Sequence, residues 1–371
     1  MKINVTSALL PSLDSLMPMM EEIWNSGFVT NNGPKHNLLE KSLKEYLGVE
    51  NISLFGNGTL ALMIAIKALD LKGEIITTPF TFPATPHSIS WFGIKPVFCD
   101  INPDTMCIDV DKIESLITKD TSAIMPVHVY GNVCDVEKID RIAKKYNLKV
   151  IYDAAHAFGA EVDGVPIGRF GDASMFSFHA TKLFNTIEGG CLTFNDPLLK
   201  QKSDLLKNFG IKNEEEIVDI GINSKLNEIQ SMIGLLNLEL ISEERKKRSK
   251  IKKIYDKNLS NISGIVINQH LPEVPSLQYY PIKIKKDLFG IDRNQLHAEL
   301  KELGINARKY FYPLLSNIDA YKDLPSSSKS HLPVSNRVVT EVLCLPFHGK
   351  IEAFEAEAIC DKISLLARSK I

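Results

Sequence analysis

The residue whose type and setting most directly suggest chemistry is Lys182, in the stretch SFHATKLFNTIEGG (residues 177–190). It follows a short apolar run and is flanked by aromatic and aliphatic residues. Such neighbours remove water from an ammonium group and lower its pKa, and lysines of this kind attack carbonyl carbons. A single lysine is more often a helix residue with an apolar stem and a solvated charge. Other residues must therefore decide between a covalent catalyst and a surface charge.

A second candidate is the glycine-rich stretch GNGTLAL (residues 56–62), which follows an expected strand and opens an expected helix. The free backbone N–H groups and the dipole at a helix N-terminus suit a phosphate. The same letters match the weak dinucleotide pattern G-x-G-x-x-A, which requires an acidic residue at the end of the next strand. That strand ends in IITTP, without an acid. A site for one phosphate in this stretch is therefore favoured over a dinucleotide site and over a merely capped helix.

Three further side chains complete a recognisable set. Asp153 ends a strand in VIYDAAHAFGA (residues 150–160); a carboxylate there is a helix cap, a buried ion pair or a partner for a protonated ring nitrogen. His156 is either a packed core histidine or a donor to a ring oxygen. Phe82 could pack in the core or stack on a flat cofactor. A lysine, a carboxylate, an aromatic and a phosphate site together indicate pyridoxal 5'-phosphate (PLP).

These residues lie at the ends of strands in a strand–helix alternation that begins near residue 50. The alternation predicts an α/β fold with a mostly parallel sheet, whose ligand sites lie at the carboxyl ends of the strands. A long, charged helix over residues 226–257 then leads into a segment with its own strands and helices, the last over residues 353–370. We expect a large α/β domain with an N-terminal arm over residues 1–240 and a small α+β domain over residues 241–371.

Composition argues against several classes of function. With 43 basic and 45 acidic residues among 371, the net charge is −2, so we expect neither nucleic acid nor membrane as a partner. The basic run ERKKRSKIKK (residues 244–253) is expected to be the solvated face of a helix. Six cysteines without a C-x-x-C pair predict buried, reduced thiols and no metal site. The absence of a signal-peptide pattern or a long apolar stretch predicts a cytoplasmic protein.

The chain resembles the DegT–DnrJ–StrS group of sugar aminotransferases, which are PLP-dependent enzymes of the aspartate-aminotransferase fold (fold type I). The resemblance runs from about residue 5 to about residue 350 and rests on the kind, order and spacing of its motifs. They are NGTLAL, TPFTFPAT, VHVYGN, DAAHAFGA, SFHATKLFNTIEGG, GINSKLNEIQ and ARKYFYP. The resemblance implies transfer of the amino group of L-glutamate, by way of pyridoxamine phosphate, to a nucleotide-linked keto-deoxysugar.

The same resemblance implies a role for each residue. Lys182 would hold the cofactor covalently and act as general acid and base, and Asp153 would keep the pyridine nitrogen protonated. The other cofactor contacts would be His156 on the ring hydroxyl, Phe82 on the ring face, Gly58, Thr59 and Ser177 on the phosphate, and Asn223 on the phosphate of the partner subunit of a homodimer. The substrate side would include Thr30, Lys225, Arg308 and Tyr310. Many relatives have N-Y-R or N-F-R where this chain has NSK (residues 223–225), which leaves the substrate contacts open.

Overall similarity within the group favours dTDP-4-keto-6-deoxy-D-glucose as substrate and dTDP-4-amino-4,6-dideoxy-D-glucose as product, for O-antigen or another surface polysaccharide. The alternatives are amination at C3 of a dTDP-3-keto sugar and at C4 of a UDP-4-keto sugar. A related branch that dehydrates or deoxygenates sugars has histidine in place of the lysine, so Lys182 argues against it. From another class, a non-catalytic regulatory protein with the same fold stays an alternative.

Overall fold

The computed structural model describes residues 2–368, and its largest element is a seven-stranded sheet. In spatial order the strands are β1 (Asn51–Phe55), β9 (Gly190–Phe194), β8 (Ala173–Ser177), β5 (Lys149–Asp153), β4 (Thr121–Ile124), β2 (Glu74–Thr77) and β3 (Lys95–Phe98). The strands from β8 to β3 are parallel, whereas β9 is antiparallel to both of its neighbours. The predicted α/β fold with a mostly parallel sheet is confirmed.

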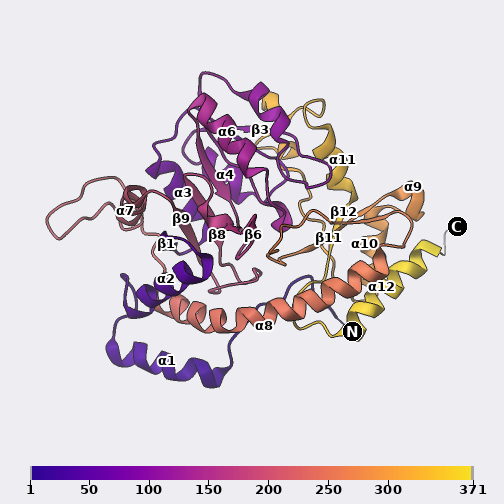
Figure 1. Ribbon diagram of the computed structural model, residues 1–371, viewed down its shortest axis with the longest axis horizontal. Coiled ribbons are helices and arrows are strands. Elements are labelled where there is room, and N and C mark those ends of the chain that lie inside the picture. Colours follow the sequence, from indigo (N-terminus) through magenta and orange to yellow (C-terminus); the bar gives the residue numbers. More distant parts are fainter. Residues whose placement is uncertain (1, 369–371) are drawn as a thin grey trace.

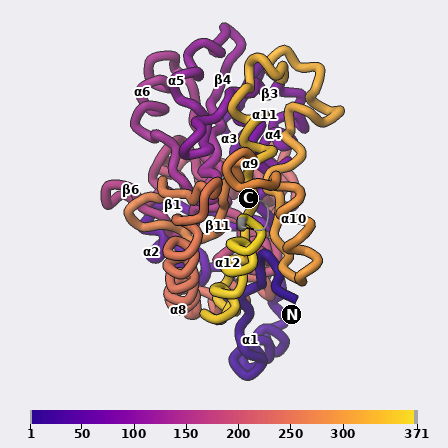
Figure 2. Tube along the Cα trace, turned by 90° about the vertical axis from the view of Figure 1, so that its right-hand side faces the viewer, coloured from indigo at the N-terminus to yellow at the C-terminus, as the bar shows by residue number. Residues whose placement is uncertain are grey.

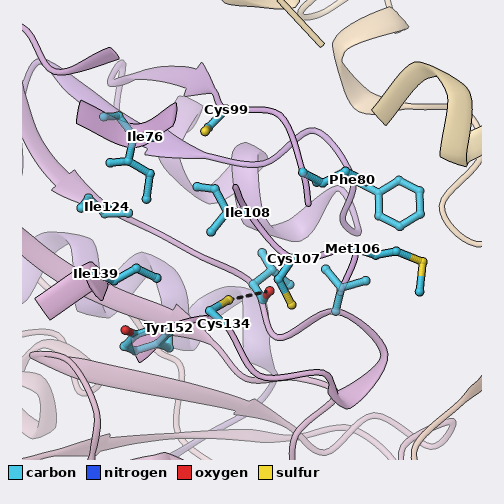
Figure 3. Close-up of a cluster of buried hydrophobic side chains, with 14 of the residues drawn as sticks. Ile76, Phe80, Cys99, Met106, Cys107, Ile108, Ile124, Cys134, Ile139 and Tyr152 are labelled. Carbon is cyan, nitrogen blue, oxygen red and sulfur yellow. Dashed lines mark hydrogen bonds between the residues drawn. The ribbon is translucent and has the colours of Figure 1, made fainter. Parts of the chain in front are cut away.

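Helices cover both faces of this sheet (Figure 1). One face packs against α3 (Gly58–Ala68), α4 (Ala84–Ser90) and α7 (Pro197–Leu206), and the other packs against α2 (Pro34–Leu47) and α6 (Val136–Tyr146). Successive strand residues alternate between the faces. Ile75 therefore joins the α3 side, whereas Ile76 joins the α6 side. Figure 3 shows part of the α6-side core, where the Cys134 thiol donates to the carbonyl of Val127 at 3.2 Å.

Local sequence signals explain where these helices begin. Asp135 caps α6 through a hydrogen bond from the backbone N–H of Lys138, as its sequence position predicts. Asn57 caps α3 in the same way, and its side chain accepts from the N–H of Leu60 at 2.9 Å. The strand that ends in Asp153 is buried after its first residue, as expected for a central strand covered on both sides. These caps and strands bring the first turn of α3 and Asp153 to one edge of the sheet.

A smaller antiparallel sheet consists of β10 (Ile265–Ile267), β11 (Tyr280–Ile284) and β12 (Val342–Leu345). It packs with α10 (Arg293–Glu302) and α12 (Ala353–Arg368) around a second core. The long helix α8 (Glu228–Leu259) contacts both α2 and α12, and Figure 2 shows α8 and α12 side by side. The remaining helices and strands are α1 (Leu13–Ser26), α5 (Val110–Ile113), β6 (Glu161–Val162), β7 (Val165–Pro166), α9 (Lys286–Phe289) and α11 (Pro333–Glu341).

The expected division after residue 240 falls within α8, and the two-domain description stays a prediction. The expected last helix is present up to Arg368, and the end of its predicted range, with the C-terminal residues of the small domain, lies outside the described residues. Met1, the first residue of the large domain, also lies outside them. Over residues 2–368, no helix is both apolar and long enough to cross a membrane.

The expectation of a solvated face for the basic run is wrong for two of its charged residues. Glu244 and Arg248 are buried between α8 and the small sheet, where Arg248 Nε donates to Glu244 Oε1 at 2.7 Å. Arg248 also donates to the carbonyl of Leu277 at 3.1 Å, which fastens the segment before β11 to α8. All six cysteines are free and buried, as predicted.

Candidate active site

A cavity of about 600 Å³ opens where β5 and β8 end and α3 begins. This is the edge at which parallel α/β sheets bind their ligands. The far side is closed by Tyr279, which directly precedes β11, and by Arg308, Tyr310 and Phe311 in the segment after α10. The predicted residues that line it are Gly58, Thr59, Phe82, Asp153, His156, Ser177, Lys182, Arg308 and Tyr310.

Lys182 lies in the turn after β8, and its amine points into this cavity rather than along an exposed helix face. Its backbone is held on both sides by the buried side chain of Gln278. The Gln278 Oε1 atom accepts from the N–H of Leu183 at 2.7 Å, and its Nε2 atom donates to the carbonyl of Thr181 at 3.0 Å. Burial lowers the pKa of Lys182 to about 8, an effect that the nearby charge of Asp153 opposes. The lysine is thus held in place and easily deprotonated.

Asp153 is 4% exposed and forms no ion pair within the described part of the chain. Its Oδ2 atom accepts from the Thr85 hydroxyl at 2.7 Å, and its Oδ1 atom accepts from the N–H of Ala155 at 3.0 Å. Burial raises the pKa of Asp153, whereas these hydrogen bonds and the charge of Lys182 act in the opposite direction. Burial of a carboxylate without a cationic partner costs free energy. The Asp153 side chain is therefore suited to accept a hydrogen bond from a protonated group that binds in the cavity.

His156 is fixed as a neutral hydrogen-bond donor. Its Nδ1 atom accepts from the backbone N–H of Tyr130 at 3.2 Å, which leaves the proton on Nε2. Burial, together with the charge of Lys182, holds the pKa of His156 well below its usual range. Its ring is stacked on Phe311 and meets the ring of Tyr279 edge-on. The imidazole can therefore donate from Nε2 without carrying a charge.

The first turn of α3 presents backbone N–H groups to the cavity. Because Asn57 caps only the N–H of Leu60, the N–H groups of Gly58 and Thr59 are left for another acceptor. A Cβ atom on Gly58 would lie 2.9 Å from Met175 Sδ and 3.3 Å from Ser177 Cβ, so a side chain at this position would crowd this part of the cavity. Phe82, 52% exposed, offers a ring at the cavity wall.

These groups fit PLP. The cavity offers an amine for its aldehyde, a carboxylate for its pyridine nitrogen, a neutral donor for its ring hydroxyl and helix N–H groups for its phosphate. The unpaired buried Asp153 and the open first turn of α3 are two independent features of the structure that this cofactor would satisfy.

Three predicted residues, all within the described part of the chain, do not line the cavity. Asn223 and Lys225 lie beside the edge strand β1, where Lys225 pairs with Phe55. The Lys225 amine donates to Asn208 Oδ1 and lies 5.6 Å from the ring centre of Phe209. Thr30 lies in the exposed loop between α1 and α2. The structure therefore divides the predicted site into a cavity group, whose members line the cavity, and an edge group beside β1, which consists of Asn223 and Lys225. Thr30 belongs to neither.

The cavity also contains residues that the sequence interpretation missed. His179 Nε2 lies 3.6 Å from Glu188 Oε1, and the His179 ring contacts the Thr181 hydroxyl at 2.8 Å. Their position within six residues of Lys182 was a signal that could have identified them. Tyr279 lies 5.9 Å (ring centre) from the Lys182 amine but far from it in sequence, and only the fold brings them together.

The mostly parallel sheet with helices on both faces, and the lysine and carboxylate at its carboxyl edge, define a PLP-dependent transferase of fold type I. The profile of the DegT/DnrJ/EryC1/StrS aminotransferase family matches residues 14–364, and the chain belongs to this family. Membership implies PLP as the cofactor.

Individual relatives agree with this assignment over nearly their whole length. The chain is 46% identical to a dTDP-4-amino-4,6-dideoxy-D-glucose transaminase of Shigella dysenteriae, over 97% of this chain and 98% of the relative. It is 43% identical to an Escherichia coli transaminase of the same name, over 100% of this chain and 99% of the relative. The structure of DesI in the presence of its TDP-sugar product superposes with a TM-score of 0.94 at 30% identity, over 100% of this chain and 94% of DesI.

Proposed function

We propose that the protein is a PLP-dependent aminotransferase that transfers the amino group of L-glutamate to dTDP-4-keto-6-deoxy-D-glucose. The product would be dTDP-4-amino-4,6-dideoxy-D-glucose. The observation that carries the reaction class is the cavity shared by a lysine of lowered pKa and a buried, unpaired carboxylate. The names of the two transaminases that are more than 40% identical support the choice of sugar.

When bound, PLP supplies an aldehyde that bonds covalently to amines and a ring that withdraws electrons from the neighbouring carbon. Lys182 would hold the cofactor through Nζ. When it is not bonded to the cofactor, the Lys182 amine would take a proton from the substrate carbon that carries the nitrogen and deliver it to the carbon on the other side of that nitrogen. A pKa of about 8 makes both directions of this transfer accessible near neutral pH. Asp153 would keep the proton on the ring nitrogen.

The remaining cavity residues would hold and orient the reactants. The N–H groups of Gly58 and Thr59 and the hydroxyl of Ser177 would bind the phosphate, and Phe82 would stack on the ring. His156 would donate from Nε2 to the ring hydroxyl. On the substrate side, the Arg308 guanidinium lies over the Tyr310 ring at 4.2 Å. This contact would hold a positive charge at the wall of the cavity for an anionic substrate group.

We further propose a homodimer in which each cavity is completed by its partner. Apolar side chains are exposed on α1 and on the α7–α8 connection, which extends away from the body in Figure 1. They include Leu13, Trp24, Phe209, Ile217 and Ile220, the last 85% exposed. These exposed apolar side chains would form the surface that the partner covers. Asn223, which does not line the cavity of its own chain, would bind the phosphate in the partner's cavity.

The same proposal covers the cellular setting and the domains. A nucleotide-linked sugar as substrate and six free thiols favour a cytoplasmic location and a role in O-antigen or other surface polysaccharide synthesis. A large domain over residues 1–240 and a small domain over residues 241–371 would enclose the cofactor between them.

The decisive experiment follows the visible absorption band of the cofactor-loaded protein. L-Glutamate should bleach the band, and after removal of the amino acid, dTDP-4-keto-6-deoxy-D-glucose should restore it. Lys182→Ala should abolish both changes while the protein stays folded, and Lys329→Ala, at an exposed position, serves as the matched control.

Each alternative gives another result. An unchanged rate in Lys182→Ala would disprove the aminotransferase assignment, and a non-catalytic regulator would show no bleaching by glutamate. Restoration of the band only by a dTDP-3-keto sugar or a UDP-4-keto sugar would keep the reaction class and replace the substrate.

A further inference from the structure

Glu228, the first residue of α8, is a buried acid that the proposed chemistry does not use. It is 1% exposed, and within residues 2–368 it forms no ion pair. The Glu228 carboxylate is stabilised by hydrogen bonds from backbone N–H groups instead. Its Oε2 atom accepts from the N–H of Lys35 at 2.8 Å, and its Oε1 atom accepts from the N–H of His36 at 2.8 Å.

These two N–H groups are the ones that an N-cap side chain normally satisfies. The N-cap residue of α2 is Gly33, which has no side chain to perform this role, and the helix begins at Pro34. Glu228 therefore caps α2 from a distant helix. Since it also lies in the first turn of α8, its negative charge is stabilised by the N-terminal dipoles of two helices.

The loop that precedes α2 depends on the same residue. The backbone N–H of Glu228 donates to the carbonyl of Val29 at 3.0 Å. A Cβ atom on Gly33 would lie 2.6 Å from the Glu228 carboxyl carbon, which shows how closely the loop is packed against it. Asn31 and Asn32 both have positive φ, a conformation that asparagine adopts more readily than most residues. This loop carries Thr30, one of the predicted substrate contacts.

The neighbouring edge group has supports of its own. The N–H of Gly56 donates to the carbonyl of Ser224 at 2.7 Å, and the N–H of Ser224 donates to the carbonyl of Lys207 at 3.0 Å. Asn223 and Lys225 are therefore fixed to β1 and α7 whether or not Glu228 is charged. Loss of the Glu228 carboxylate would release the α1–α2 loop and leave the Asn223 segment in place.

We propose that Glu228 is a positioning residue for the nucleotide-sugar substrate, because it fastens both ends of the Thr30 loop to the start of α8, three residues after the Asn223–Lys225 segment. This inference rests on the proposed function, together with Thr30 and Lys225 as the substrate contacts that the family resemblance implies. The substrate L-glutamate would bind to Lys182 and the other cavity residues. Glu228 forms no hydrogen bond with these residues, all of which lie within residues 2–368. The two halves of the reaction should therefore differ in their dependence on Glu228.

The test compares the two half-reactions in Glu228→Gln. The glutamine amide would place a donor against one of the two backbone N–H groups. Since one of the two hydrogen bonds to the loop is lost, we expect kcat/KM for dTDP-4-keto-6-deoxy-D-glucose to fall roughly tenfold. The kcat/KM value for L-glutamate should stay within about twofold of the wild-type value. Gly33→Ala, which crowds the same carboxylate, should produce the same selective loss and serves if Glu228→Gln does not fold.

Asp100→Asn is the matched control. Asp100 is also a buried carboxylate that caps a distant helix, since it accepts from the N–H groups of Val334 and Ser335 at the start of α11. Asp100 lies beside β3, at the opposite edge of the sheet from β1. Asp100→Asn should therefore leave the ratio of kcat/KM for the keto-sugar to kcat/KM for L-glutamate unchanged. Equal losses for both substrates, or no loss for the sugar, would overturn the role of Glu228. A wild-type protein that does not aminate the sugar would instead disprove the proposed function.

Discussion

At the scale of single residues, the cavity places opposite electrostatic demands on two neighbouring side chains. Burial pushes Lys182 towards its neutral form and Asp153 towards its protonated form, while each charge partly stabilises the other. A cofactor that takes a covalent bond from the lysine and brings a ring N–H to the carboxylate would relieve both demands. In the cofactor-free protein, burial of the charged Lys182 amine should therefore lower the free energy of unfolding by a measurable amount.

That cost has a defined pH dependence. The pKa of Lys182 is lowered from 10.5 to about 8, so below pH 8 the amine is charged in both the folded and the unfolded chain, and the folded state bears the full burial penalty. The penalty declines as pH rises from 8 to 10.5. Lys182→Met should stabilise the cofactor-free protein by roughly 2 kcal/mol at pH 7, and by much less at pH 10. Urea denaturation of both proteins at the two pH values would measure this, and an equal difference at both would contradict it.

At the scale of elements, α8 is linked through the segment before β11 to the backbone around Lys182. Arg248 on α8 binds the carbonyl of Leu277, and the next residue, Gln278, holds the backbone on both sides of Lys182. The position of the amine thus depends on a segment that follows it by nearly a hundred residues and enters β11. A change at Gln278 should act on every step in which Lys182 takes part.

Gln278→Ala should lower kcat/KM for glutamate and for the keto-sugar alike, each by about tenfold, because misplacement of a reacting group slows both proton transfers. This distinguishes it from Glu228→Gln, which is expected to affect the sugar alone. Stopped-flow measurement of the two half-reactions would show the difference, with Gln269→Ala, an exposed glutamine, as control. A loss confined to one substrate would refute this role for Gln278.

Particular residues show what the sequence could and could not reveal. Asp153 and the phosphate site at the start of α3 were identified because they lie at the end of a strand and the start of a helix, which local patterns define, whereas Ser177 was assigned only by the family resemblance. Tyr279 and Gln278 were missed because their contact with the Lys182 turn exists only once β11 is packed against the large sheet. Glu244 and Arg248 were misjudged for the same reason, since nothing in a charged run shows which of its members a distant segment will bury.

At the scale of the whole molecule, the separation of the cavity group from the edge group predicts subunit complementation. Lys182→Ala and Asn223→Ala homodimers should each be nearly inactive. Coexpression of the two chains should restore about one quarter of the wild-type activity, because half of the dimers are mixed and each has one site with both residues intact. If Asn223 acted within its own chain, no mixed site would be intact and activity would stay low. Separately purified homodimers, assayed without exchange, provide the baseline.

The exposed α1 surface has a practical consequence. The chain has two tryptophans, Trp24 on α1 and Trp91 at the end of α4, which are 69% and 78% exposed in the single chain. Neither lies in the core, so unfolding a separate subunit should change their fluorescence little. Burial of Trp24 against a partner would instead shift its emission to shorter wavelengths. Dilution of the protein should reverse this shift, and the emission maximum therefore reports assembly rather than folding.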